Sequence, residues 1–394
     1  RDEMVKVAAT GIASATSPFN KNTAIPAIGS TSTVEEKEAN TGGTIVPVNS
    51  ATTAGTSDVS QLLAGGFVEG LGDTSGSLME STDDMTNKPD KEKASDTTYA
   101  AKLYCASVLC NWSRNAGNAD ILNKEGAVKA LMELCALKVP HILYFCAAGF
   151  RYMSEQPSLA KKMIEESVVP ALADLISFSR VDEFICANVA ITFVNLTRVN
   201  GYRGPQTASA PVLEGEGTLV DQGIVPAISA IITNRADFSA TCARGLYNLT
   251  CVDAAFPGIE RVIRALVQLS QASTAGVKHI CAAALCNLSD LKNARPRMLE
   301  EGVVSVLGNL AKGSETRTRR VCAVILQNLS ATKACRVDMV GRNCVQVAYS
   351  LSVDSDPIIL RCIGLTVSRI AHETVNCNRI ITEGGITALC NIAV

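Results

Sequence analysis

The stretch CAAALCNLS at residues 281–289 is one of seven copies of a short sequence motif that recurs along this 394-residue chain. The copies are CASVLCNWS (105–113), CAAGFRYMS (146–154), VAITFVNLT (189–197), CARGLYNLT (242–250), CAAALCNLS (281–289), CAVILQNLS (322–330) and CIGLTVSRI (362–370). Their Asn slots lie 41, 43, 53, 39, 41 and 40 residues apart. A period near 40 predicts a solenoid of helical repeats, because each unit is too small to bury its own apolar face.

The motif also predicts which side chains are buried. The six-residue step from Cys to Asn is nearly two helical turns, so both residues lie near one side of a helix. Small residues around the Cys allow neighbouring helices to approach closely. The larger buried residue is expected two positions before the Asn slot, at Leu109, Phe150, Phe193, Leu246, Leu285 and Leu326.

All fifteen cysteines follow residue 97, and six of them fill one repeat slot. These six are Cys105, Cys146, Cys242, Cys281, Cys322 and Cys362. Cys behaves as a small apolar residue there, and an odd number without clustered spacing favours free structural thiols in a reducing compartment.

A Gly before an apolar run follows most Asn slots. It occurs in EGAVKAL (125–131), QGIVPAI (222–228), EGVVSVL (301–307) and EGGITAL (383–389). Gly accepts positive φ without steric cost, which suits a sharp corner between two helices. Ser167 and Arg261 occupy this slot in the second and fourth units, so we expect those two corners to have a different shape.

A short helix, a Gly corner, an IPxLxxL-like helix and an AxxALxNLS-like helix together resemble the armadillo repeat over residues 98–394. HEAT repeats share the period but usually lack both the Gly corner and the AxxALxNLS-like motif. The resemblance implies an all-α fold, a right-handed α-solenoid of about six full repeats with partial repeats at both ends. We expect a lone third helix at 98–114, then units near 115–155, 156–197, 218–250, 251–289, 290–330 and 331–371. The unfinished repeat at the C-terminus indicates a fragment of a longer polypeptide.

Composition changes near residue 97. Residues 1–97 are rich in Thr, Ser, Gly and Ala and carry a net charge of −7, which leaves +5 on residues 98–394. We expect a disordered segment, with VSQLLAGGFVEGL (59–71) as the one part that could become ordered. An insertion at about 198–217 is expected to be a loop, in which Tyr202 and Arg203 either contact a partner or are part of a tolerated expansion.

The chain lacks catalytic signatures. Its three His are far apart, and no HExxH, phosphate-binding loop or Gly-x-Ser-x-Gly motif occurs. No apolar run is long enough to span a membrane. We therefore expect a non-catalytic protein scaffold without a cofactor, metal or small-molecule substrate, in the cytosol, cytoskeleton or cilium, with the nucleus left open. The alternatives are an armadillo module of a larger enzyme, as in ubiquitin ligases with a U-box, and a structural ciliary or cytoskeletal component.

The Asn series is the main candidate site. The resemblance implies that third helices line a concave groove, where Asn amides pair with the backbone of an extended partner. This gives Asn111, Asn195, Asn248, Asn287 and Asn328 as groove residues. The alternative is that these Asn bond within the solenoid. Nuclear-import adaptors of the family carry Trp four residues before many of these Asn, and this chain does not, so recognition of basic import signals is not expected.

Basic residues share the helical stripe of the Asn series. Positions four, eight and eleven before an Asn place Arg244, His279, Arg317 and Arg320 on it. Because guanidinium groups suit carboxylates, we expect an extended, acidic peptide as the partner. The alternative is that ETRTRR (315–320) is a solvated helix start. A charge of +5 over this length disfavours nucleic acid. The acidic stretch around Glu80, Asp83 and Asp84 is a further candidate competitor for the groove.

Overall fold

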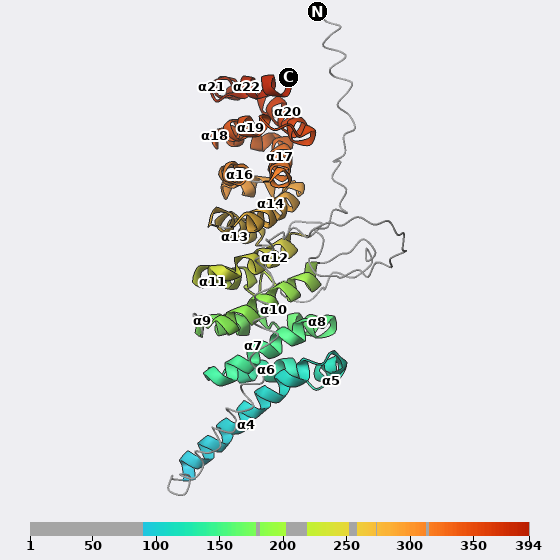
Figure 1. Ribbon diagram of the computed structural model, residues 1–394, viewed down its shortest axis with the longest axis vertical. Helices are drawn as coiled ribbons and strands as arrows, with labels where there is room; N and C mark the ends of the chain where they lie inside the picture. Colours follow the sequence, from blue (N-terminus) through green and yellow to red (C-terminus); the bar gives the residue numbers. More distant parts are fainter. Residues whose placement is uncertain are drawn as a thin grey trace, which may run out of the picture. The chain divides into compact units, whose positions relative to one another are not determined.

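The repeats form a stack of helical units (Figure 1). The computed structural model describes residues 90–178, 182–201, 219–251, 258–272, 274–312 and 315–393. Within these ranges the chain is helical and contains no strand. The expectations for residues 1–89, the acidic competitor stretch, the apolar patch at 59–71, Tyr202 and Arg203 lie outside them.

Three classes of helix repeat along the chain. The first helices, where present, are short: α5 (Ala119–Lys124), α8 (Pro157–Glu165), α15 (Arg295–Glu300), α18 (Arg336–Gly341) and α21 (Cys377–Thr382), with 3-10 turns η2 (Ala116–Asn118), η3 (Ala236–Phe238), η4 (Lys333–Cys335) and η5 (Thr374–Asn376). The second helices are α6 (Ala127–Cys135), α9 (Val169–Phe178), α11 (Ile224–Asn234), α13 (Ile259–Ala272), α16 (Val303–Ala311), α19 (Cys344–Ser352) and α22 (Gly385–Ala393). The third helices are α4 (Asp90–Ser113), α7 (Pro140–Ser154), α10 (Glu183–Gly201), α12 (Ser239–Thr250), α14 (Ala275–Asp290), α17 (Thr316–Ala331) and α20 (Pro357–Ala371).

The third helices pack side by side in chain order, and the second helices form a neighbouring layer. The core lies between these layers. Its largest side chains include Phe150 and Phe193, both in the slot two residues before the Asn position. Cys146, Cys242, Cys281, Cys322 and Cys362 are 0–2% exposed, whereas Cys105 is exposed. The predicted solenoid of armadillo-type repeats, with partial repeats at both ends, is therefore confirmed.

The corners between first and second helices are more uniform than the sequence predicted. Gly126, Gly223, Gly302 and Gly384 all have φ between 72° and 93°. The expectation of different corners at Ser167 and Arg261 was wrong. Ser167 adopts the same left-handed conformation with φ 55°, and in the fourth unit Gly258 (φ 82°), not Arg261, occupies the corner.

Two boundaries also differ from the prediction. Helix α4 begins at Asp90, eight residues before the expected start. Lys91, Glu92, Lys93 and Ala94 favour helix, which explains the extension. Helix α10 continues to Gly201, so the first residues of the expected loop at 198–217 are helical.

Candidate functional site

The Asn amides form bonds between neighbouring repeats. In four successive units the amide donates to a Ser or Thr hydroxyl of the preceding third helix. The pairs are Asn195–Ser154 (3.0 Å), Asn248–Thr197 (3.2 Å), Asn287–Thr250 (3.2 Å) and Asn328–Ser289 (2.9 Å). Each hydroxyl donates in turn to a carbonyl of its own helix. The recurring Asn-Leu-Ser/Thr motif thus produces a ladder of hydrogen bonds that links successive repeats.

The ladder changes at its ends. Asn111, which is not part of the ladder, is exposed, whereas Asn195 is only 8% exposed, so these two predicted positions differ most in their access to solvent. In the second copy of the motif the slot holds Tyr152, whose ring centroid lies 5.7 Å from the Arg114 guanidinium carbon and 5.2 Å from that of Arg151. Asn248, Asn287 and Asn328 are half-buried. The predicted Asn positions therefore lie on one series of helices but have unequal access to solvent.

Two of the predicted cations are exposed. Arg244 lies in the middle of α12 and Arg317 in the first turn of α17, and neither forms an ion pair with another described residue. One complete third helix, α14, separates them. Neighbouring packed helices lie about 8–10 Å apart, and the two residues are offset along the helix axes by about 10 Å. Their side chains therefore begin roughly 19–23 Å apart.

His279 has one ring nitrogen bonded and the other buried. Its Nδ1 lies 3.1 Å from Thr318 Oγ1, and its Nε2 is buried without a hydrogen-bond partner. Burial lowers the pKa of His279, and the nearby Arg317 lowers it further, while Glu315 opposes the shift. The imidazole is therefore held neutral between α14 and α17 and does not present a cation to a partner, contrary to its predicted place in a basic row.

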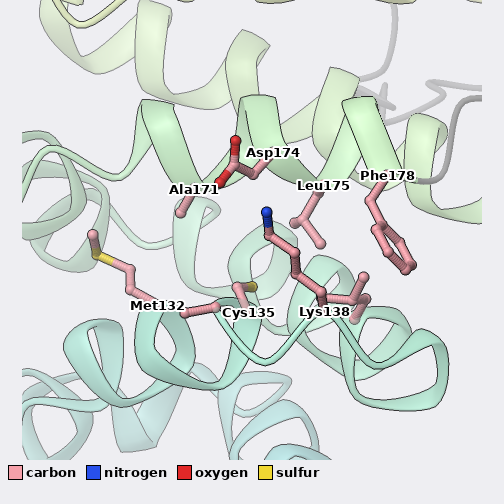
Figure 2. Close-up of a pocket in the computed structure, with 9 residues that line it drawn as sticks. Met132, Cys135, Lys138, Ala171, Asp174, Leu175 and Phe178 are labelled. Carbon is pink, nitrogen blue, oxygen red and sulfur yellow. The ribbon is translucent and has the colours of Figure 1, made fainter.

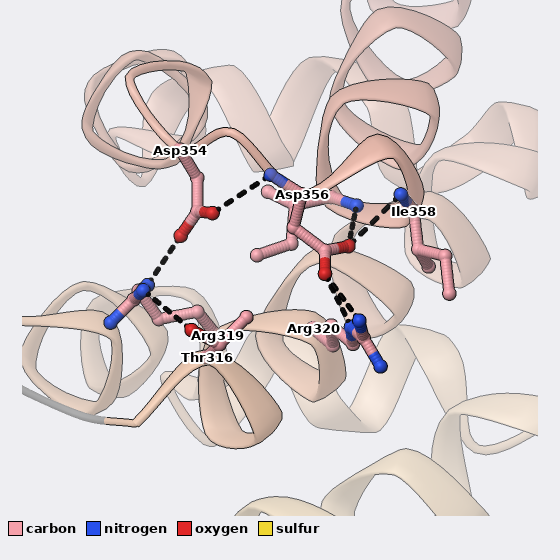
Figure 3. Close-up of polar contacts among 7 residues, drawn as sticks. Thr316, Arg319, Arg320, Asp354, Asp356 and Ile358 are labelled. Atoms are coloured by element: carbon pink, nitrogen blue, oxygen red, sulfur yellow. Dashed lines mark hydrogen bonds and ion pairs between the residues drawn. The ribbon is translucent and has the colours of Figure 1, made fainter.

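Arg320 belongs to a junction between the fifth and sixth units (Figure 3). Its Nε lies 2.6 Å from Asp356 Oδ2, and Asp356 also accepts bonds from the backbone N–H groups of Ile358 (3.0 Å) and Ile359 (3.2 Å). Beside this pair, Arg319 Nε lies 2.6 Å from Asp354 Oδ2. The Arg320 guanidinium lowers the pKa of the Asp356 carboxyl. Arg320 was predicted as a groove residue, but its charge is already neutralised by a neighbouring repeat.

Sequence reasoning missed a second set of inter-repeat bonds. Arg295 and Arg336 occupy equivalent places in the first helices, and their Nε atoms donate to the last carbonyls of α14 and α17, at Ser289 (2.8 Å) and Ser330 (3.0 Å). Asn391 donates to Ser352 at 3.0 Å. The 41-residue step from Arg295 to Arg336 was a visible signal, since it equals the repeat period.

A cavity lies between the second helices α6 and α9 (Figure 2). It is lined by Met132, Cys135, Ala136, Lys138, Leu143, Ala171, Asp174, Leu175 and Phe178 and has a volume of about 70 Å³. Ligand pockets usually measure about 300–1,000 Å³. The cavity is therefore too small for a cofactor or a drug-sized substrate.

The cysteines, the possible metal ligands and the lengths of the helices bear on what else the described part of the chain could do. All fifteen cysteines are free, and burial raises the pKa of Cys281 and Cys322 to about 12, so these thiols stay protonated at neutral pH. No group of His, Cys, Asp and Glu in the described ranges has the arrangement of a metal site. Within the same ranges, every helix is too short or too polar to cross a membrane.

Comparisons with known proteins identify the fold. No protein-family model and no curated protein matches the chain. A chain from a structure of a phosphorylation switch that controls the interaction between cadherin and beta-catenin matches with a TM-score of 0.50 and 12% identity, over 69% of this chain and 53% of that one. An engineered protein matches with a TM-score of 0.49 and 18% identity, over 72% and 68%. A computationally designed armadillo repeat protein for modular peptide recognition has a TM-score of 0.35 and 13% identity, over 72% and 95%.

Together, the three-helix unit, the left-handed corner and the match to the cadherin–beta-catenin structure define an armadillo-like repeat fold. At these identities the comparisons establish the fold alone.

Proposed function

We propose that this protein is a non-catalytic scaffold that binds an extended, acidic segment of a partner protein along its third helices. The observation that carries this proposal is the pair of exposed cations, Arg244 and Arg317, on neighbouring parts of one helical layer. The match to a structure concerned with the cadherin–beta-catenin interaction agrees with a role in protein binding. A cytosolic or cytoskeletal location remains part of the proposal.

The proposed site implies a spacing for the acidic groups of the partner. An extended peptide advances about 3.3 Å per residue, so it covers the roughly 19–23 Å between Arg244 and Arg317 in about six or seven residues. Beside this path, Asn248 lies about one turn and Asn287 about two turns nearer the C-terminal ends of their helices. Each uses an amide N–H within the ladder and retains its carbonyl oxygen as an acceptor for a peptide N–H group. The best partner segment therefore carries two carboxylates about six residues apart.

The spacing provides the test. Fluorescent peptides with two Glu separated by three, six or nine residues of Ser and Thr are titrated with the full chain, and their polarisation is measured. The six-residue spacing should bind most tightly, and Arg244→Ala with Arg317→Ala should weaken it about tenfold or more, with less effect at high salt. Arg261→Ala is the matched control, because Arg261 is exposed on the second-helix layer. Equal binding by the double variant, or equal loss in the control, would refute the proposal.

A further inference from the structure

Three arginine side chains meet at the C-terminal end of α17. They belong to three other helices, α15, α18 and α20, and each donates a hydrogen bond to a group at or just beyond the last turn of α17. The pairs are Arg295 Nη1 to Thr332 Oγ1 (3.1 Å), Arg336 Nε to the Ser330 carbonyl (3.0 Å) and Arg369 Nη1 to the Gln327 carbonyl (2.9 Å). These contacts bring the three guanidinium groups (the arginine cluster) to one end of one helix, where the helix dipole favours positive charge.

The carboxylates near the arginine cluster offset only part of its charge. Glu373 lies 3.2 Å from Arg336 Nη1, and Asp290 raises the pKa of Arg295. Arg369 forms no ion pair with another residue in the described part of the chain. Three positive charges therefore face two negative ones, which leaves a net charge of +1.

The arginine cluster is also poorly solvated. Arg295 is only 7% exposed, and burial lowers its pKa. Burial likewise is the main cause that lowers the pKa of Arg369, and the neighbouring Arg336 lowers it further. Arg369 in turn lowers the pKa of Arg295, so it lies close enough to both arginines for their charges to repel. An anion bound among them would supply the compensation that water gives to an exposed arginine.

The arginine cluster retains unused hydrogen-bond donors, because each guanidinium group carries five N–H bonds. Within the described ranges, Nη2 of Arg295, Nη2 of Arg336 and both Nε and Nη2 of Arg369 have no hydrogen-bond partner. None of these atoms is buried from solvent. The cluster can therefore donate to a ligand without giving up the bonds that hold it on α17.

The number of donating side chains indicates the kind of anion. A carboxylate is bound by the two parallel N–H groups of a single guanidinium fork. A phosphoryl group on a side chain offers three acceptor oxygens and a charge of about −1.5 to −2. Donors on three separate side chains, with a net positive charge, therefore suit a phosphoryl group better than a carboxylate.

We propose that the arginine cluster is a binding site for a phosphoryl group, which accepts hydrogen bonds from the unused N–H groups of Arg295, Arg336 and Arg369. The group is carried by a phosphorylated side chain of a protein or by a free phosphate compound, since both present the same anionic oxygens. Arg317, a cation of the proposed peptide site, lies in the first turn of the same helix, about 20 Å away. The phosphoryl site is therefore separate from the peptide site and does not depend on it.

Calorimetric titration of the full chain tests the site. The probes are inorganic phosphate and a pentapeptide with blocked termini, Gly-Gly-X-Gly-Gly, in which X is phosphoserine, Glu or Ser. Inorganic phosphate and the phosphoserine peptide should bind at least about tenfold more tightly than the Glu peptide, because a carboxylate engages fewer of the guanidinium groups. Tighter binding of the phosphoserine peptide than of inorganic phosphate identifies a phosphorylated protein as the source, and the reverse order identifies a free phosphate compound.

Substitutions locate the binding. Arg369→Gln should weaken it about tenfold or more, whereas Arg361→Gln, exposed on the same helix about 12 Å away, should leave it unchanged. Arg244→Ala with Arg317→Ala should also leave it unchanged, which separates this site from the peptide site. If circular dichroism shows that Arg369→Gln has lost helix, Arg369→Lys takes its place, because it keeps the charge, lacks the fork and should still weaken binding. The proposal is overturned by no binding below about 10 mM, by equal binding of the Glu peptide, or by unchanged binding in the Arg369 variant.

Discussion

The Asn that recurs in four successive repeats links each of them to the preceding repeat. The Asn of four successive units reaches across to a hydroxyl of the preceding unit, and that hydroxyl is held by its own helix. The sequence predicted the Asn positions but left two roles open. The structure shows the intramolecular bond, and contact of the remaining carbonyl oxygens with a partner stays a prediction.

Removing one ladder amide should destabilise the solenoid measurably. Asn328→Ala removes bonds to Ser289 and Asp290, both at 2.9 Å, and should lower the free energy of unfolding by about 0.5–1.5 kcal/mol in urea. Asn111→Ala is the control, because Asn111 lies exposed on α4 and should change stability little. Equal effects of the two substitutions would show that the ladder does not contribute to stability.

His279 should make stability depend on pH. Its folded-state pKa is lowered, so below about pH 6.5 the unfolded chain binds a proton that the folded chain resists. This contribution is fully present above pH 6.5 and is lost as the pH falls, by at most about 1.4 kcal/mol per pH unit. Urea unfolding at pH 7 and pH 5 should show a smaller difference in His279→Gln than in the unaltered chain. An unchanged difference would mean that His279 titrates normally in the fold.

At the scale of the helix, local sequence explains most starts and corners. Left-handed corners occur at Gly in five places, but also at Ser167 and Asn343, where the surrounding repeat imposes a conformation that the residue type does not favour. Asn343 tolerates it better than most residues. The start of α20 is easier to read from the sequence. Asp356 precedes Pro357, and its side chain caps the helix by accepting hydrogen bonds from two backbone N–H groups.

The cap and the ion pair at Asp356 can be separated by two substitutions. Asp356→Ala removes both and should lower the free energy of unfolding by at least the roughly 0.5–2 kcal/mol that an N-cap contributes. Asp356→Asn keeps a good capping side chain and loses only the charge opposite Arg320, so it should cost less. Chemical denaturation of both variants measures the difference. A larger loss in Asp356→Asn than in Asp356→Ala would contradict the capping role.

At the scale of the solenoid, the period of the sequence predicted the stack, its units and the buried Cys slot, because these depend on spacing within one chain. Other features depend on how separate helices meet. Arg320 looked like a free cation on its own helix, and only the position of the next unit pairs it with Asp356. In the same way, the sequence does not show that His279 is half-buried between α14 and α17 with its Nε2 shielded from solvent.

The polar links between units are unevenly distributed, which predicts uneven local stability. Around the last full units the links are Arg295–Thr332, Arg319–Asp354, Arg320–Asp356, Arg336–Glu373 and Arg369–Gln327. Among the described residues, the third unit joins the second through the ion pair Arg235–Glu183 and the hydrogen bonds Gln222–Ile164 and Asn248–Thr197. Its described part enters α11 directly from a turn at residues 219–223.

In a solenoid, stability is approximately a sum over units and their nearest-neighbour interfaces, so the better-linked units should open less often. Native-state hydrogen exchange, corrected for intrinsic rates, should therefore find the slowest amides in α17 and α20 and faster exchange in α11. Arg320→Ala should selectively accelerate α17 and α20, whereas Arg261→Ala, on the solvent side of α13, should leave their exchange unchanged. If α11 exchanges more slowly than α20, the inter-unit links do not determine where the solenoid opens.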